Sequence, residues 1–396
     1  MKRRDFIWAI GFMVATAAFS IYVTSLALLN RPPITLDFLR NLGLSRTFTT
    51  AQCGMGQKLI GLEGSSEPHL KKLAEYQQVC GTNPASRLMV FTDMPNSDSV
   101  AVDNATKMAK TLKDMAGAGV KALVVLEPVT NWGAVDFNEY RNGFYDVWLD
   151  TYFKTLKQSG ITDEQMGMWV PFPEANLPYW NHQNSKPDDF AANVTKTVIL
   201  QKKYFPNSKA SVMLNSATYA NDDFDWRRGE YISLVPYLKT IPKGLIDSFG
   251  YQGLPWAPPS NQPGVGVMDA NEYLNTKIAI ESANQLGVKS IWLNTGTFGR
   301  KYTLDPEKTV VFTAEQRKDI LAGVQTQAKT LRDQGYSVAV NLFAEDKSGT
   351  QEATDWSYWA NGQPKKSPDS VIFADFVSDL HREHIDFWLF DQIHDR

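Results

Sequence analysis

Short apolar runs followed by helical patterns recur along most of this chain, and their alternation limits the folds open to it. Each run is five or six residues long. Short strands that are apolar throughout suit a sheet covered by helices on both faces. The expected strands are residues 58–62, 87–91, 121–126, 166–170, 210–214, 245–249, 289–293 and 336–340. The expected helices are residues 68–79, 100–116, 137–158, 188–205, 226–238, 269–286, 313–333 and 369–393.

Eight strand–helix units with no break in composition predict an α/β protein, specifically a closed (β/α)8 TIM barrel. A doubly wound parallel sheet is the alternative. That fold normally carries a glycine-rich phosphate-binding turn after an early strand, and the sequence has no such turn. The helix at 313–333 also begins with Thr313 and Gln316 in the spacing of a capping box.

The first residues predict a membrane segment ahead of the barrel. Lys2, Arg3 and Arg4 precede an uncharged apolar stretch over residues 6–29. As a helix, that stretch is long enough to cross a hydrocarbon core about 30 Å thick. Basic residues before it predict a single-pass signal anchor in the cell membrane, with the rest of the chain outside the cytoplasm. The alternative is a signal peptide cleaved near Ala17, which would release a secreted protein.

The predicted domain organisation follows from these features. Residues 1–30 form the basic stub and the anchor, and residues 31–46 form a linker that Pro32 and Pro33 keep from continuing the helix. Residues 47–396 form the barrel domain.

Charge and composition exclude several classes of partner. The formal net charge is −3, from 40 Lys and Arg against 43 Asp and Glu, without a long basic block. A nucleic-acid partner is therefore not expected. The chain has no C-x-x-C or H-E-x-x-H motif and its five His are scattered, so neither a metal nor a cofactor is expected.

Cys53 and Cys80 are the two cysteines of the chain, and both fall in the predicted exported part. In an oxidising compartment such a pair predicts one disulfide near the start of the domain. Two unpaired thiols remain the alternative, because the sequence does not show whether the two residues come within bonding range.

The chemistry of a (β/α)8 barrel lies at the carboxyl ends of its strands, so the residues that follow the apolar runs are the candidate site. All of them are polar, and five of the eight runs are followed by an acid. Crowded carboxyl groups keep a proton available near neutral pH, as glycoside hydrolysis requires. These candidates are Glu63, Asp93, Glu127, Glu174, Asn215, Tyr251 with Gln252, Asn294 and Glu345.

Aromatic residues fall in the same expected loops and could stack on sugar rings. The alternative for each is packing beneath a long loop. The candidates for substrate binding are Trp132, Trp180, Trp256 and Trp356, together with Asn176. Asn341, ahead of Glu345, is a plausible hydrogen-bond donor to the site, and Trp292 is expected in the core.

The segment Pro173-Glu174-Ala175-Asn176, with Tyr179 and Trp180 after it, resembles the acid-bearing fourth strand of glycoside hydrolase family 26, the β-mannanase family. The segment Asp247-Ser-Phe-Gly-Tyr251 is similar to the sixth strand of that family, which ends in a Tyr that touches the nucleophile. The resemblance implies a hydrolase of β-linked polysaccharide, mannan- or glucan-like, with Glu174 as the general acid/base.

The sequence departs from this family at two positions. Pro173 stands where the family has His, and the expected seventh strand, followed by Asn294, lacks the nucleophilic Glu. Glu127 or Glu345 is the candidate for the second catalytic carboxylate, and their separation from Glu174 would set the stereochemical outcome. Glycan binding without cleavage and a structural role at the cell surface are the alternatives to catalysis.

Overall fold

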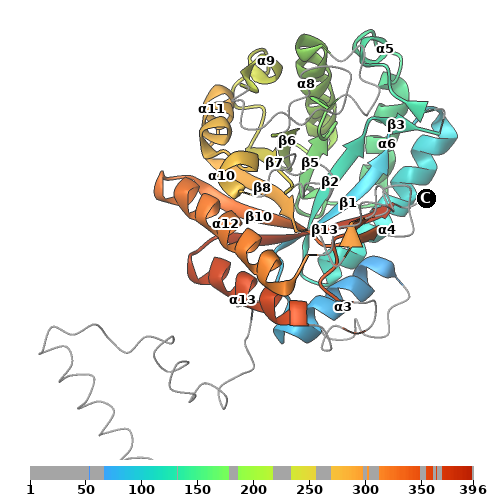
Figure 1. The fold of residues 1–396 in the computed structure, drawn as a ribbon. Coiled ribbons are helices and arrows are strands. Elements are labelled where there is room, and N and C mark those ends of the chain that lie inside the picture. The colour runs from blue at the N-terminus through green and yellow to red at the C-terminus, as the bar shows by residue number, and fades with distance from the viewer. Residues whose placement is uncertain are drawn as a thin grey trace, which may run out of the picture. The chain divides into compact units, whose positions relative to one another are not determined.

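The computed structural model describes residue 53 and residues 67–131, 133–177, 186–216, 233–255, 269–297, 301–302, 312–347, 354–359, 363 and 368–394. All of them belong to one compact unit, Gln52–Arg396. This unit is a closed barrel of eight parallel strands with helices around it (Figure 1). The (β/α)8 barrel predicted from the sequence is confirmed.

The barrel strands are hydrogen-bonded in the order β1-β13-β10-β8-β7-β6-β5-β2. The last strand in the chain pairs with the first, which closes the ring. The strands are β1 (Arg87–Asp93), β2 (Lys121–Glu127), β5 (Met168–Pro171), β6 (Lys209–Asn215), β7 (Ser248–Gln252), β8 (Ser290–Gly296), β10 (Ser337–Phe343) and β13 (Asp386–His394).

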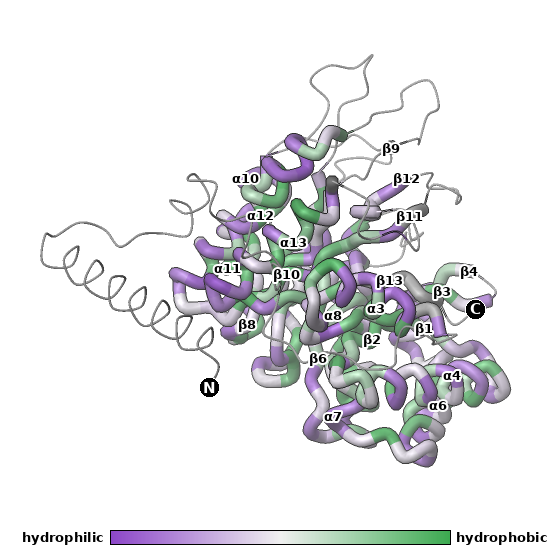
Figure 2. Tube along the Cα trace, turned by 90° about the horizontal axis from the view of Figure 1, so that it is seen from below, coloured by the Kyte–Doolittle hydropathy of each residue, from purple (hydrophilic) through white to green (hydrophobic). Residues whose placement is uncertain are grey.

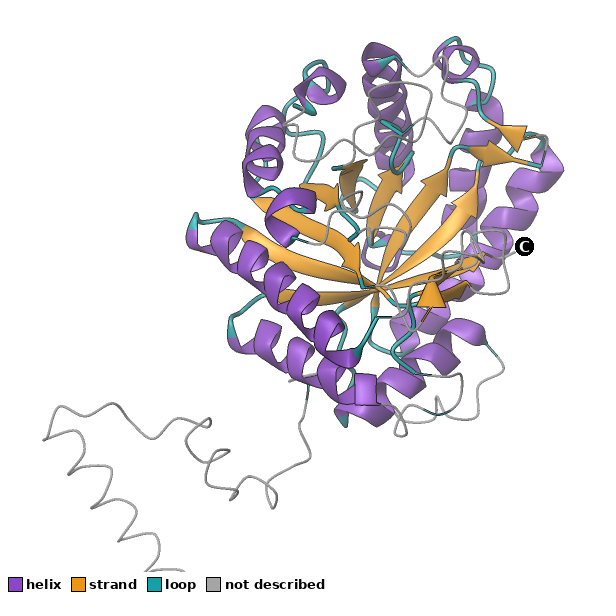
Figure 3. Ribbon diagram, in the orientation of Figure 1, coloured by secondary structure: helices purple, strands orange, loops and turns teal. Residues whose placement is uncertain are grey.

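The helices lie outside the ring of strands (Figure 3). Hydrophilic and hydrophobic residues alternate along them, as expected for helices with one face on a sheet (Figure 2). They are α3 (Pro68–Cys80), α4 (Asp98–Gly117), α5 (Phe137–Arg141), α6 (Asp146–Gln158), α7 (Asp163–Met166), α8 (Pro187–Tyr204), α9 (Val235–Leu238), α10 (Ala270–Tyr273), α11 (Thr276–Leu286), α12 (Ala314–Asp333) and α13 (Pro368–Arg382).

Short strands after the barrel strands form two further sheets. β3 (Val129–Thr130) pairs with β4 (Gly133–Ala134) in the loop after β2. The other sheet has the order β11-β12-β9 and joins the loops that follow β8 and β10. Its strands are β9 (Lys301–Tyr302), β11 (Asp346–Lys347) and β12 (Thr354–Asp355).

The expected strand numbering was wrong by one position. The ring closes without the expected first strand, residues 58–62, which lies outside the described residues. The expected last helix, 369–393, is instead α13 followed by the barrel strand β13. His384 has a left-handed backbone (φ 56°), which ends the helical path before the aromatic run of β13. The strand that precedes Glu174 is therefore the third barrel strand, and β10 is the seventh.

Other expected boundaries also changed. The helix expected at 137–158 is interrupted after α5, where Gly143 adopts a φ of 97°. The helix expected at 269–286 is split into α10 and α11, and of the helix expected at 226–238 the described residues show only α9. Met166 ends α7 rather than beginning a strand, and β7 starts three residues after the expected position 245. The capping box of Thr313 and Gln316 is present at the start of α12.

Large aromatic side chains fill the barrel interior. The Trp292 indole donates its Nε1–H to Ser211 Oγ at 2.9 Å, and its ring centroid lies 5.6 Å from that of Trp388. Gly250 makes this possible, because a Cβ at that position would lie 2.4 Å from the Trp292 ring. Trp292 is fully buried, so the expectation that it belongs to the core is confirmed.

The described residues contain no helix that is both long and apolar enough to span a bilayer. The expected anchor, residues 6–29, lies outside the described part of the chain.

Candidate active site

Glu174 leaves the end of β5 through an unusual backbone turn. Phe172 and Glu174 have positive φ angles of 55° and 54°, a left-handed conformation that L-residues other than glycine seldom adopt. Hydrogen bonds hold the turn: Glu174 N–H donates to Met213 O at 3.1 Å, and Leu177 N–H donates to Glu174 O at 2.8 Å. Two strained residues within three positions of one another are typical of a functional site.

Two amide groups donate to one oxygen of the Glu174 carboxylate. Asn215 Nδ2 lies 2.6 Å from Glu174 Oε1, and Gln252 Nε2 donates to the same oxygen. Asn176 holds Asn215 in turn, because its Nδ2 donates to Asn215 O at 2.8 Å and its Oδ1 accepts from Asn215 N–H at 2.9 Å. Donors aimed at a carboxylate favour its ionised form.

Asn215 and Gln252 belong to a longer series of buried amides, here called the amide row: Asn215, Gln252, Asn294 and Asn341. They are successive register partners on β6, β7, β8 and β10. Asn294 Nδ2 donates to Gln252 Oε1 at 2.5 Å, and Asn341 Nδ2 donates to Asn294 Oδ1 at 2.6 Å. The sequence singled out each of these residues, but not the connection between them.

Glu127 ends β2, the strand that pairs with β5. Its register partner at the end of β1 is Asp93. Alternation along β2 places Glu127 on the same face as Leu123. The register partner of Leu123 is Met89, whose Sδ lies 3.8 Å from Asn341 Nδ2 inside the barrel. Glu127 therefore lies on the interior face of β2. Only 3% of Glu127 is exposed.

Glu345 follows β10, which lies four steps from β5 in the ring of strands and therefore opposite it. The Glu345 carbonyl accepts a hydrogen bond from Trp356 N–H at 2.7 Å. The corrected strand count changes the comparison with glycoside hydrolase family 26. An acid does follow the seventh strand, but the fourth strand, β6, ends in Asn215, while Glu174 follows the third.

Tyr251 precedes Gln252 on β7, and the two side chains lie on opposite faces of the strand. Gln252 faces the interior, so alternation places Tyr251 on the outer face of β7, where it is fully buried. Its ring centroid is 6.3 Å from that of Phe249, another residue of that outer face. The contact between Tyr251 and a catalytic group that the resemblance implies stays a prediction, while the neighbouring Gln252 donates to Glu174.

Trp356 is a packing residue rather than an open platform for a sugar. Its ring meets Phe343 edge-on with centroids 5.2 Å apart, and only 6% of the residue is exposed. Trp359 is buried as well, and its Nε1 donates to Glu75 Oε2 at 2.8 Å. The remaining predicted site residues lie outside the described part of the chain: Glu63, Trp132, Trp180 and Trp256.

Arg317 on α12 is a buried residue that the sequence reasoning missed. Its side chain is 0% exposed and its Nη1 lies 3.1 Å from Asp369 Oδ2. It also donates to Thr297 Oγ1 at 2.9 Å and to Ser357 O at 3.0 Å, so it ties the loops after β8 and β10 together. The guanidinium lies 4.0 Å from the centre of the Tyr358 ring, whose pKa is raised by burial.

A signal for Arg317 exists in the sequence. The apolar residues Ile320, Leu321 and Val324 follow it at the spacing of one helix face, so an Arg at position 317 falls on the buried stripe of α12. A buried Arg in such a stripe needs a carboxylate partner, and Asp369 at the start of α13 supplies it.

The described residues contain no group of three or more His, Cys, Asp and Glu side chains arranged to hold a metal ion. The chemistry that these residues offer is that of carboxyl groups and amides.

No protein-family model and no curated protein matches this sequence. Among solved structures, the exo-β-1,4-mannosidase Op5Man5 from Opitutaceae bacterium strain TAV5 is similar over 80% of this chain and 57% of its own, with a TM-score of 0.50 and 11% identity. The family 1 β-glucosidase from Thermotoga maritima is similar over 80% of this chain and 86% of its own, with a TM-score of 0.49 and 10% identity.

The endo-β-1,4-mannanase from Thermotoga petrophila is similar over 77% of this chain and 71% of its own, with a TM-score of 0.43 and 14% identity. At such identities structural similarity concerns the fold alone. The chain is thus a (β/α)8 barrel protein with carboxyl and amide groups gathered at the carboxyl ends of its strands. Membership of glycoside hydrolase family 26 stays a prediction.

Proposed function

We propose that this protein is a glycoside hydrolase that acts on a β-linked polysaccharide, mannan- or glucan-like, at the carboxyl ends of the barrel strands. The observation that carries the proposal is the Glu174 carboxylate, which accepts hydrogen bonds from Asn215 and Gln252. The buried Glu127 ends β2, the strand that pairs with β5. Glycoside hydrolysis requires two carboxyl groups in different protonation states. The substrate class rests on the family resemblance of the segment around Glu174.

The different surroundings of the two carboxyl groups suggest their roles. Amide donors favour an ionised Glu174, which acts as the nucleophile or as the base that activates water. Burial favours a protonated Glu127, which acts as the acid that protonates the departing glycosidic oxygen. This assignment differs from the sequence-based expectation that Glu174 is the general acid/base. A separation of about 5 Å between the two groups would give retention, and one of about 6.5–9.5 Å inversion.

The proposal includes the location of the enzyme. The basic residues at positions 2–4 and the apolar stretch at 6–29 favour a single-pass anchor with the barrel outside the cytoplasm, where extracellular polysaccharide is available. Cleavage of that stretch would release the enzyme instead.

Two kinds of substrate separate the roles of the carboxyl groups. A polysaccharide needs a proton on its leaving oxygen, whereas an aryl glycoside with a nitrophenolate leaving group does not. We expect Glu127→Gln to lower kcat on the polysaccharide about 10²–10⁴-fold and to retain hydrolysis of the aryl glycoside within about tenfold. Glu174→Gln should abolish hydrolysis of both substrates.

Glu345→Gln tests the competing carboxylate, and Glu164→Gln, at an exposed position on α7, is the control for the loss of a charge. Both variants should hydrolyse the two substrates as the wild type does. Loss of hydrolysis of both substrates in Glu345→Gln would transfer the role of Glu174 to Glu345, and loss of polysaccharide hydrolysis alone would transfer the role of Glu127. A wild-type protein that binds β-linked glycans in a glycan screen but cleaves none would contradict the proposal and favour a binding protein.

A further inference from the structure

The amide row runs obliquely from the carboxyl ends of the strands into the barrel. Asn215 and Gln252 are the last residues of β6 and β7, whereas Asn294 and Asn341 are each the fifth of seven residues in β8 and β10. The next register partner is Trp388, the third residue of β13. Tilted strands in a closed barrel produce such a descent along a line of register partners. The row therefore links the Glu174 carboxylate to the barrel core.

Amides at these depths are unusual for the interior of a (β/α)8 barrel, which branched apolar side chains normally fill. Asn341 is 0% exposed, and among the described residues its Oδ1 has no hydrogen-bond partner. A buried amide with an unsatisfied oxygen costs free energy, so Asn341 is not explained by stability.

The hydrogen bonds from amide to amide within the row point the same way, toward Glu174. Asn341 donates to Asn294, Asn294 donates to Gln252, and Gln252 donates to Glu174. A primary amide can rotate by half a turn and exchange its oxygen and nitrogen. The donor on Gln252 Oε1 prevents this exchange, because a reversed Gln252 would place its oxygen against the Glu174 carboxylate and its NH₂ against another donor.

The orientation of the Asn294 amide must be fixed in the same way. Asn341 fixes it by donating to Asn294 Oδ1. Successive donors in a low-dielectric interior also polarise one another, which strengthens the last hydrogen bond of the series. Each amide thus fixes the orientation of the next, and the series ends on a group that, when ionised, can only accept.

We propose that Asn294 and Asn341 are positioning residues for the Glu174 carboxylate and act on it through Gln252. The proposal rests on the proposed function, in which Glu174 reacts as an anion. It assigns a role in catalysis to residues on β8 and β10 that donate to Glu174 only through an intermediate amide.

Other ionisable groups lie at the carboxyl ends of the barrel strands. The described ionisable residues at the carboxyl ends of neighbouring strands are Glu127 on β2 and Asp93 on β1, with Glu345 after β10 on the opposite side. The ends of β6 and β7 contribute the amides of Asn215 and Gln252 instead. The test therefore leaves every one of these acids in place.

The test replaces amides of the row by leucine, which has nearly the same shape, in Asn294→Leu and Asn341→Leu of the full chain. Asn193→Leu is the matched control. Like Asn341, Asn193 is 0% exposed and has an Oδ1 without a hydrogen-bond partner among the described residues. Its Nδ2 donates to Phe137 O at 2.8 Å, and it lies on α8, away from the row. Its loss should affect stability without affecting Glu174.

Two measurements are made on each variant. The first is the pH profile of kcat/KM on a β-linked glycan. The second is the titration of the Glu174 carboxyl carbon by ¹³C NMR, assigned with Glu174→Gln, which requires no activity. Loss of donors disfavours the anion, so we expect the midpoint of titration and the acid limb of the profile to move to higher pH. The shift should be about half a pH unit or more for Asn294→Leu and smaller for Asn341→Leu.

Unchanged titration in Asn294→Leu, or an equal shift in Asn193→Leu, would overturn the proposal. If Asn341→Leu does not fold, the titration of Glu174 in Asn294→Leu and in the isosteric Gln252→Met decides whether the amides act on that carboxylate. A shifted titration in a protein that hydrolyses no glycan would contradict the proposed function and leave the positioning of Glu174 standing. An active enzyme with an unshifted titration would contradict the positioning role of Asn294 and Asn341 and leave the proposed function standing.

Discussion

At the scale of single residues, the backbone of Glu174 is as distinctive as its side chain. Its φ of 54° belongs to a region that favours glycine, yet the position carries a carboxylate that two amides hold in place. The left-handed conformation costs an ordinary L-residue about 1–2 kcal/mol. The chain therefore accepts local strain in order to aim this side chain.

This strain predicts that Glu174→Gly is more stable than Glu174→Ala, the reverse of the order expected at a helical position. Both Glu174→Ala and Glu174→Gly remove the carboxylate, but only alanine has a Cβ to strain in the left-handed region. We expect the glycine variant to be more stable by about 1 kcal/mol in denaturant unfolding.

The same pair at Asp319, which is exposed in α12, is the control. There alanine should be the more stable by about 1 kcal/mol, because the backbone is helical. An alanine variant of Glu174 that equals or exceeds the glycine variant in stability would contradict the strained turn.

At the scale of elements, α12 fixes the loops around the site through one side chain. Arg317 pairs with Asp369 at the start of α13 and donates to groups of the loops after β8 and β10. Arginine suits this position because its planar fork presents five donors in a fixed geometry. A lysine there would leave several of these acceptors without a donor.

Removal of the Arg317 charge should therefore lower the stability of the protein strongly. We expect Arg317→Met to lower the free energy of unfolding by about 3–5 kcal/mol, because it leaves the mostly buried Asp369 carboxylate without its partner. Arg317→Met with Asp369→Asn should cost less than the sum of the single changes, as chemical denaturation would measure.

Arg382→Met provides the comparison at an exposed ion pair, with Asp379 on the same helix. Its effect should stay below about 1 kcal/mol. A loss at Arg317 as small as that at Arg382 would show that the loops are held by other contacts.

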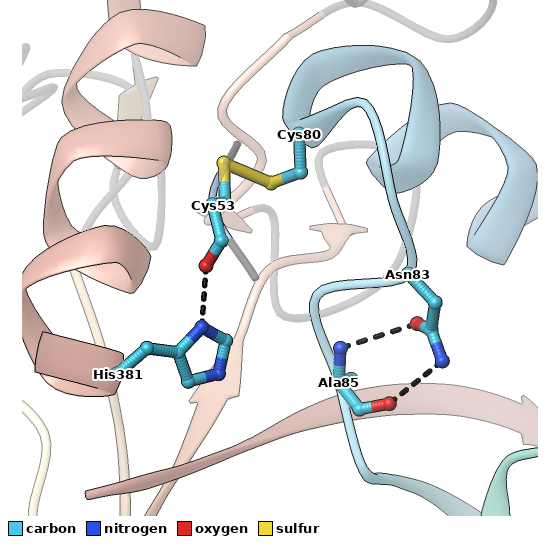
Figure 4. Close-up of a disulfide and its surroundings, with 5 residues drawn as sticks. All are labelled: Cys53, Cys80, Asn83, Ala85 and His381. Carbon is cyan, nitrogen blue, oxygen red and sulfur yellow. Dashed lines mark hydrogen bonds between the residues drawn. A yellow bond between two sulfur atoms is a disulfide. The ribbon is translucent and has the colours of Figure 1, made fainter. Parts of the chain in front are cut away.

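At the scale of the whole molecule, a disulfide ties the start of the barrel unit to its outer helices. Cys53 is bonded to Cys80 at the end of α3, and Cys53 O accepts a hydrogen bond from His381 Nδ1 on α13 (Figure 4). The sequence left the pairing open, and the structure contains the bond. His381, to which the sequence assigned no role, contacts the chain at Cys53.

The cross-link spans a sequence separation of 27 residues, from which the chain-entropy estimate of its stabilisation is about 3.5 kcal/mol. We expect the double variant Cys53→Ala with Cys80→Ala to lose about that free energy of unfolding, measured with denaturant at pH 7. Wild-type protein reduced with dithiothreitol should unfold at the same denaturant concentration as the variant. A clear difference between the two would assign the loss to side-chain packing instead of the cross-link.

The sequence by itself determined the barrel class and placed Glu174 after a strand. Both rest on local patterns: apolar runs of strand length, helical spacing between them, and polar residues directly after the runs. The capping box at Thr313 and the core position of Trp292 were also predicted, because each depends on neighbouring residues or on one apolar run.

Only the tertiary structure decided the strand count and the amide row. Residues 386–394 are the last strand because they pair with β1 and β10, and no local pattern shows that the ring closes there. The amide row exists because the registers of four strands align Asn215, Gln252, Asn294 and Asn341. Register is set by pairing between segments far apart in the chain, so it arises only when the barrel closes.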